Sequence, residues 1–208
     1  MGRVTELCAS FPADPHAVRA RWLVWLGAGA REVAWALCSI PAERWTAIPP
    51  AAESLGTWPP ARHVRHLSLT ENHLLVPVAH ALLDGSTADV PTRSELDELN
   101  AAWDPSLSSE AVGGLVDALA EGRFDLLQRL EVAPDEVWDR PLPAGVAPGE
   151  APAHLDWLLA RAHQHELEHL SRLWKLALYW DRAFSTSSAA TSRVSLPLQP
   201  ADRLEESH

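Results

Sequence analysis

The sequence of 208 residues has only two cysteines, Cys8 and Cys38, and they form no C-x-x-C pair. Two cysteines are too few for a disulfide framework, so both thiols are expected to be reduced. No apolar run approaches the roughly 20 residues of a membrane-spanning helix. Residues 1–15 also lack the apolar stretch of a secretory signal. Together these absences predict a cytoplasmic protein.

Basic residues are scarce as well. The chain has 17 Lys and Arg against 28 Asp and Glu, which gives a formal net charge of −11. Nucleic-acid binding relies on Lys and Arg against phosphate, and anionic membrane surfaces attract the same residues. The charge therefore predicts no nucleic-acid partner and no membrane partner. A small-molecule substrate is the partner that we expect.

Apolar residues, in contrast, make up 47% of the chain, which is enough for a full hydrophobic core. Their spacing follows the helical period in four segments, and no segment shows the alternation of a strand. We expect helices over residues 14–40, 60–83, 108–130 and 153–183. The pattern predicts an all-α fold, an antiparallel four-helix bundle over residues 1–184, with a flexible Ser/Thr-rich tail over residues 185–208.

The segments between these helices contain proline and glycine. Residues 86–107 are expected to be mostly loop, and a short extra turn is expected near residues 135–138. Pro77 falls late in the second helix and should kink or shorten it, because proline lacks the N–H of the helical hydrogen bond.

Two residue types outside the polar motifs lead to further expectations. Cys38 lies in the last turn of the first helix beside apolar neighbours, and no sequence feature pairs it with a base. It is therefore predicted to be a buried structural cysteine, as is Cys8. Trp157 and Trp174 lie off the main apolar arc of the fourth helix, which predicts a homodimer face.

The densest polar stretch is RAHQHELEHL, residues 161–170. Its His165 and His169 are four residues apart, so they lie one helical turn apart on the same face. That face is the apolar arc of the fourth helix, whereas Glu168 points to the opposite side, towards water. Two imidazoles one turn apart can bind a single divalent metal ion. A third ligand must then come from another helix.

The second helix offers four histidines. His66, His73 and His80 are seven residues apart and form one stripe at the rim of the apolar arc, and His63 points closer to the centre of that arc. At most one residue of the stripe can meet the pair on the fourth helix at the same level. His73 and His80 lie further along the helix and are expected to border the core.

The second helix also resembles a known family. In TWPPARHVRHLSLTEN, Trp58 precedes His66 by eight residues, an apolar residue follows His66, and Glu71 comes five residues after it. This is similar to the helix-two signature of the DinB/YfiT-like family of bacterial metal-binding four-helix bundles. The resemblance implies that His66 is the ligand from this helix, with His63 as its main rival.

HQHELEH resembles the helix-four signature of the same family, in which two histidines four residues apart flank an acidic residue. Those positions are His165, Glu168 and His169. The resemblance extends over most of residues 14–182 and implies a metal site formed by His66, His165 and His169.

Such a site implies a reactive metal. Three imidazoles leave at least one coordination position open, which suits zinc or nickel with an exchangeable ligand. The ion would make a hydroxide or a thiolate available near neutral pH. The resemblance implies transfer of an external low-molecular-weight thiol, such as mycothiol or bacillithiol, to an electrophile. Alternatives are metal-dependent hydrolysis and a non-catalytic stress-response bundle that binds a metal or a ligand.

Two carboxylates fall within the apolar arcs and allow two interpretations. Glu71 and Glu166 could orient a ligand histidine through its other ring nitrogen or act as a catalytic base. Each could instead be a buried carboxylate paired with an arginine. The sequence leaves both interpretations open.

Overall fold

A computed structural model describes residues 15–49, 55–143, 146 and 153–188. Within these ranges the chain is helical and has no strand. No helix among them combines the length and the apolar character that crossing a bilayer requires. Cys8 and residues 189–208, the larger part of the predicted tail, lie outside the described residues.

Three of the four predicted helices are close to their expected bounds. Helix α2 spans Pro15–Cys38, and α7 spans Ser109–Glu131 after Ser108, whose side chain accepts a hydrogen bond from the backbone N–H of Ala111. Helix α9 spans Leu155–Ser188 and extends beyond residue 183, at which the sequence placed its end. The short extra turn is also present as α8, Asp135–Trp138.

The second predicted helix consists of three continuous parts. Helix α4 spans Pro60–Thr70, the π-helical turn η2 spans Glu71–Leu75, and α5 spans Val76–Asp84. In the π-turn the N–H of Val76 bonds to the carbonyl of Glu71, one residue further back than in an α-helix. Pro77 follows at once, so the wider turn accommodates a residue that has no N–H and would crowd the preceding carbonyls. Pro77 therefore reshapes the helix without ending it.

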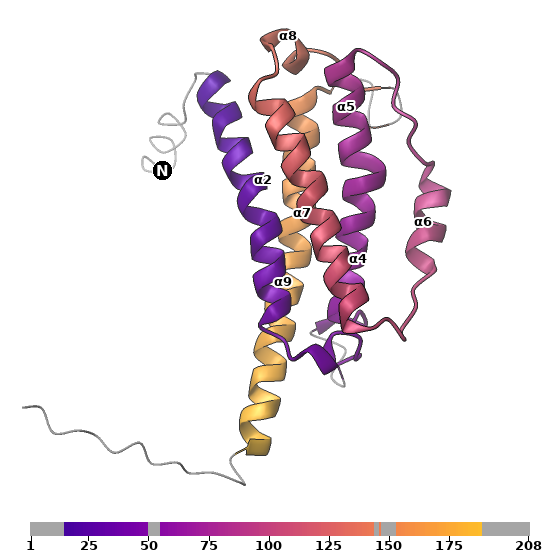
Figure 1. Cartoon of the computed structure of the whole chain (residues 1–208), viewed down its shortest axis with the longest axis vertical. Coiled ribbons are helices and arrows are strands. Elements are labelled where there is room, and N and C mark those ends of the chain that lie inside the picture. Colours follow the sequence, from indigo (N-terminus) through magenta and orange to yellow (C-terminus); the bar gives the residue numbers. More distant parts are fainter. Residues whose placement is uncertain (1–14, 50–54, 144–145, 147–152, 189–208) are drawn as a thin grey trace, which may run out of the picture.

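The expectation of a loop over residues 86–107 is wrong for its central part. Residues Arg93–Ala101 form helix α6. The side chain of Thr92 accepts a hydrogen bond from the N–H of Glu95, and the carboxylate of Glu95 accepts one from the N–H of Thr92 at 2.7 Å. This reciprocal capping box pairs two donors that a helix start otherwise leaves unbonded. The helix lies beside α4 (Figure 1), and Arg65 of α4 donates a hydrogen bond to the carbonyl of Leu99 in α6 at 2.7 Å.

The long helices pack in two pairs (Figure 1). Both α2 and α4 contact α7 and α9. Helices α2 and α9 run in one direction, and α4–α5 and α7 run in the other, so the arrangement is antiparallel between the pairs and parallel within each. The chain returns from the end of α5 to the start of α7 along the side of the bundle, and α6 lies on this return segment.

Three apolar clusters are buried in the described part of the chain, and two of them lie on opposite sides of a polar layer. The first cluster contains Leu26, Leu75, Leu126 and Leu159. The second cluster contains Val33, Leu67, Leu119 and Leu170. The polar layer between these two levels consists of Glu71, Arg123 and Glu166 and is described with the site below.

Two expectations about single residues need correction. Cys38 is exposed, because it is the last residue of α2 and the bundle does not cover it. Trp157 and Trp174 are partly buried against the apolar clusters of their own chain, and Trp174 meets Trp35 edge to face. They therefore do not form an exposed face, and the homodimer stays a prediction.

Candidate metal centre

The structure brings together the three histidines that were predicted as metal ligands. One ring nitrogen from each of His66, His165 and His169 lies within 4.8 Å of the others. His66 comes from α4 and the other two from adjacent turns of α9, and the Nε2 atoms of His66 and His165 are 2.9 Å apart. All three side chains are half-buried, so the cluster lies between α4 and α9 and remains reachable from outside.

His66 is held by a residue that the sequence did not indicate. Its Nδ1 lies 2.7 Å from Oδ1 of Asn100 in α6. The amide nitrogen of Asn100 donates to the carbonyl of Leu96, so its oxygen is the acceptor and Nδ1 of His66 carries the proton. Nε2 of His66 then presents a lone pair to the cluster. The capping signature T-x-x-E at residues 92–95 could have revealed the helix that places Asn100 here.

His63 touches the cluster but occupies a different position from His66. Its Nδ1 lies 2.9 Å from Nδ1 of His169, and only 6% of the residue is exposed. This contact occupies Nδ1 of His169 and leaves Nε2 of that ring for a metal. His63 therefore contacts the second ring nitrogen of a candidate ligand, which is where a metal-bound histidine usually has a hydrogen-bond partner. The structure groups His66, and not His63, with His165 and His169, and the choice of His66 as the ligand stays a prediction.

Trp58 covers one side of the cluster. Its ring lies 5.3 Å from His63, 5.4 Å from His66 and 5.9 Å from His169, measured between ring centroids. The guanidinium of Arg62 stacks on the outer part of this tryptophan at 4.5 Å. The eight-residue spacing from Trp58 to His66 therefore places an aromatic wall beside the ligands.

Burial keeps the imidazoles of His63, His165 and His169 neutral at neutral pH. It lowers the pKa of His63 and of His165 to about 4, with nearby positive charge as a smaller cause. Burial and the neighbouring histidines lower the pKa of His169 to about 2. A neutral imidazole has a lone pair to offer, whereas an imidazolium has none. His165 and His169 therefore present nitrogen donors at neutral pH.

The other two histidines of the second helix do not join the cluster. His73 is exposed on the π-turn. His80 is half-buried, and its Nε2 lies 3.2 Å from a carboxylate oxygen of Asp125. Both lie further along the helix, as the sequence indicated.

Glu71 and Glu166 form the polar layer with an arginine that the sequence did not single out. Arg123 of α7 donates to both oxygens of Glu71, at 2.6 and 2.8 Å, and to Oε2 of Glu166 at 3.0 Å. Its third contact is the carbonyl of Leu26 in α2, at 2.8 Å. Arginine pairing is thus the arrangement that the structure shows for both carboxylates. Among the described residues neither carboxylate bonds to a ring of the cluster.

The polar layer fits the bundle because Gly29 leaves room for it. A Cβ atom at this position would lie 1.6 Å from Oε1 of Glu166. That oxygen has no hydrogen-bond partner among the described residues, and burial raises the pKa of Glu166. The absence of a side chain at Gly29 in α2 therefore makes space for the carboxylate of Glu166 from α9.

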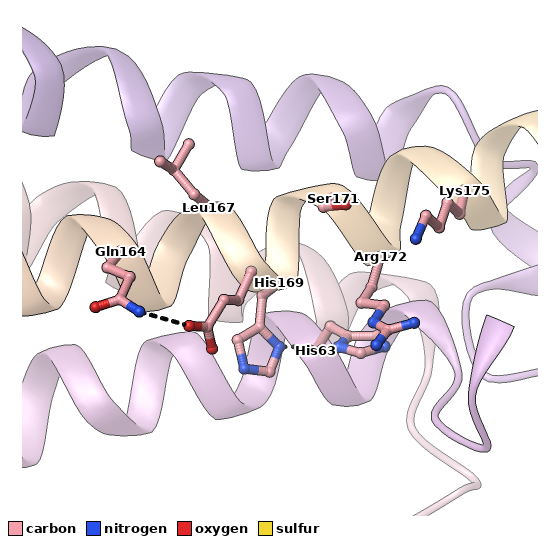
Figure 2. Close-up of a pocket in the computed structure, with 8 residues that line it drawn as sticks. His63, Gln164, Leu167, His169, Ser171, Arg172 and Lys175 are labelled. Carbon is pink, nitrogen blue, oxygen red and sulfur yellow. Dashed lines mark hydrogen bonds between the residues drawn. The ribbon is translucent and has the colours of Figure 1, made fainter. Parts of the chain in front are cut away.

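A pocket of about 690 Å³ opens beside the cluster. His63 and His169 form its inner wall, and the outer residues all belong to α9 (Figure 2). The residues from α9 are Gln164, Leu167, Glu168, Ser171, Arg172 and Lys175, in addition to His169. The volume is in the range of small-molecule sites.

Fold and site together define a class: helical bundles with a three-histidine cluster that could bind a metal. The model of the DinB superfamily matches residues 26–173, which is most of the chain, and the protein belongs to this superfamily. No curated protein and no solved structure matches the chain. The resemblance drawn from the motifs is confirmed at the level of the superfamily.

The donor set fits a divalent metal ion. Three imidazole nitrogens on two facing helices, all within 4.8 Å of one another, form a donor set that could hold one divalent ion. No carboxylate or cysteine joins the three among the described residues, so the set is that of an open site. His66 and His169 each have the second ring nitrogen fixed by a hydrogen bond.

Proposed function

We propose that the protein is a divalent-metal-dependent enzyme that transfers a low-molecular-weight bacterial thiol to an electrophilic substrate. The observation on which this rests is the three-histidine cluster, with no fourth protein ligand among the described residues and with a pocket beside it. A structural zinc site would instead be closed by four protein ligands.

Each part of the site has a separate role in the proposed reaction. A bound divalent ion would lower the pKa of a thiol or water near it, which supplies a nucleophile at neutral pH. His66, His165 and His169 would hold the ion, and Asn100 and His63 orient two of these rings. Trp58 excludes water from one side of the cluster, and the pocket beside the cluster has room for thiol and acceptor.

Thiol transfer has more support than hydrolysis. Hydrolysis commonly uses a carboxylate as a general base for water. The two carboxylates that were candidates for that role, Glu71 and Glu166, are bonded to Arg123 in the polar layer. Glu168 is the carboxylate of the pocket, and it bonds to Gln164 at 3.1 Å. Thiol transfer needs less help from a base, because a metal ion lowers the pKa of the thiol itself.

The first experiment is metal analysis of the purified protein. We expect about one divalent ion per chain in the wild type and loss of the ion in His165→Ala. His73→Ala is the matched control, because it removes an exposed histidine of the same fold. Circular dichroism must show that His165→Ala keeps the helical bundle. Equal metal content in wild type and His165→Ala would contradict the proposed centre.

The second experiment measures activity with defined probes. The zinc-loaded and nickel-loaded proteins are incubated with 1-chloro-2,4-dinitrobenzene and one of mycothiol, bacillithiol or glutathione. The thiol sulfur displaces chloride, which leaves with the thiol proton as HCl, and the thioether is followed by absorbance. We expect turnover that His165→Ala removes and His73→Ala keeps. Bound metal without transfer of any thiol would favour the non-catalytic bundle, and hydrolysis of activated esters would favour the hydrolase.

A further inference from the structure

We propose that the pocket along α9 is a subsite for a carboxylate group of the substrate, which pairs with Arg172 and Lys175. This inference deepens the proposed function and rests on it for the identity of the reacting molecule. The acid could belong to the thiol or to the electrophile, and the experiment below separates these two sources.

The first argument is the charge of the pocket residues. Arg172 and Lys175 lie on adjacent turns of α9, and both line the pocket (Figure 2). Neither has an ion pair or a side-chain hydrogen bond within the described part of the chain. Lys175 is also the only lysine of the sequence. Two unpaired cations therefore face one pocket in a chain whose net charge is −11.

The acidic residue of the pocket does not neutralise this end. Glu168 accepts a hydrogen bond from Gln164, and its carboxylate lies 3.9 Å from the guanidinium of Arg161. Both partners lie towards the start of α9, whereas Arg172 and Lys175 lie on the other side of His169. The pocket is thus polarised along the helix, and its positive end adjoins the histidine cluster.

His63 adds a donor at the same place. If Nε2 of His169 faces a metal, its Nδ1 carries the proton and donates to Nδ1 of His63. In the neutral His63 ring the remaining proton then lies on Nε2, which is buried and has no partner in the described structure. An acceptor with negative charge is the group that this end of the pocket lacks.

The helix also sets the size of the ligand. Residues 172 and 175 follow His169 by three and six positions, which is about 4.5 and 9 Å along the axis. A ligand that reacts at the histidine cluster can reach both cations with a carboxylate several bonds from its reactive atom. Small peptidic or sugar-acid thiols have this size, and so do aromatic acids that carry a leaving group.

The test compares matched ligands by titration calorimetry. Glutathione carries two carboxylates, its diethyl ester carries the same thiol without them, and S-methylglutathione carries the acids without a free thiol. We expect the zinc-loaded protein to bind glutathione about tenfold more tightly than the diester, as two charge-assisted contacts allow. The net charge of the protein would favour the more positive ester, so long-range attraction cannot produce this preference.

The protein variants identify the cations. Arg172→Gln combined with Lys175→Gln should abolish the preference for glutathione over its diester. Arg31→Gln is the matched control, because Arg31 is an exposed arginine of α2 that does not line the pocket. Metal-free protein should bind S-methylglutathione weakly, and the double variant should lose this binding. A preference for glutathione that persists in the double variant would overturn the proposal. Equal affinity for acid and ester would also overturn it if the double variant keeps the wild-type affinity for 4-chloro-3,5-dinitrobenzoate.

A last arm locates the acid and separates this inference from the proposed function. The acid belongs to the electrophile if two results are found together. The wild type binds 4-chloro-3,5-dinitrobenzoate and the double variant does not, and the wild type binds glutathione and its diester equally well. Equal affinity of zinc-loaded protein for glutathione and S-methylglutathione would show that the free thiol does not bind the metal. The carboxylate subsite would stand in that case, provided that both still bind more tightly than the diester.

Discussion

The tautomer of a single imidazole determines whether the cluster can accept a metal ion. His66 donates from Nδ1 to Asn100, and this bond directs the lone pair of Nε2 towards His165 and His169. Without a partner at Nδ1, the proton could move to Nε2 and point at the ion position. A neutral amide in α6 thus has a role that the sequence pattern of the ligands does not reveal.

We predict that Asn100→Leu weakens zinc binding by about 10–100-fold, the usual effect of losing a partner of a ligand histidine. Asn100→Asp keeps an oxygen that accepts the Nδ1 proton and should retain most of the affinity. The measurement is competition with a chelator of known affinity, with circular dichroism to verify the fold. Unchanged affinity in Asn100→Leu would show that His66 needs no such partner.

The glycines of the long helices give a second prediction at this scale. Gly29→Ala places a methyl group against the buried carboxylate of Glu166 and should reduce the free energy of unfolding by about 1–3 kcal/mol. Gly113→Ala in α7 meets nothing within 4 Å and should increase it by about 0.5–1 kcal/mol, because alanine favours the helix. Urea denaturation of both variants measures the contrast. Two changes of the same sign would refute the packing argument at Gly29.

At the scale of elements, α6 shows how a short polar helix can position a functional group. It contains no buried residue, so its stability depends on its capping box and on its contacts with α4. We predict that Thr92→Ala destabilises α6 by about 1 kcal/mol, the usual loss on removal of an N-cap side chain. Amide hydrogen exchange should rise in residues 93–101 and remain unchanged in α7.

The same variant should also weaken metal binding slightly, because α6 carries Asn100. Ser106→Ala is a suitable control, since Ser106 bonds to Asp104 on the same return segment outside α6. Faster exchange throughout the bundle in Thr92→Ala would mean that α6 is not a separate unit of stability. Slower or unchanged exchange in α6 would mean that the capping box contributes nothing.

The helices with a continuous apolar stripe could be predicted from the sequence, and those without one could not. Residues 14–40 and 108–130 have that stripe, and their predicted bounds are close to α2 and α7. Helix α6 has polar residues on most of its surface, so the spacing of apolar residues does not predict it. Only the spacing of Thr92 and Glu95 indicates where this helix starts. The π-turn at residues 71–75 was equally hidden, because Pro77 indicates a disturbance but not its form.

The residues of the candidate site also fall into those that the sequence predicts and those that it does not. His165 and His169 could be placed on one face from their spacing alone, and the family resemblance added His66. Asn100 and Arg123 come from other elements, and no spacing within one helix links them to their partners. Whether Glu71 and Glu166 serve the metal or an arginine depends on which helix faces them, and a single sequence does not contain that information.

For the whole molecule, the polar layer ties all four long helices together. Arg123 of α7 bonds to Glu71 in the π-turn, to Glu166 of α9 and to the backbone of α2. Apolar clusters lie on both sides of this layer, so a shift of any helix by one turn would bury an unpaired charge against leucine side chains. Because α9 also carries His165 and His169, the register that the layer fixes is the register of the metal centre.

The neutral histidines make the stability of the metal-free protein depend on pH. His63 and His165 have a pKa of about 4 in the folded chain, whereas a histidine of the unfolded chain has its ordinary pKa of about 6.5. Between these values the unfolded state binds more protons, so the free energy of unfolding must fall as the pH falls. For His63, which is almost fully buried, the difference corresponds to on the order of 3 kcal/mol.

We therefore predict that metal-free protein is markedly less resistant to urea at pH 4.5 than at pH 7, and that His63→Leu reduces this difference. His73→Leu, which removes an exposed imidazole, is the control for the substitution itself. Zinc at pH 7 should raise the melting temperature of the wild type by preferential binding to the folded state. Equal resistance of the metal-free wild type at both pH values would show that these imidazoles are not held neutral by burial.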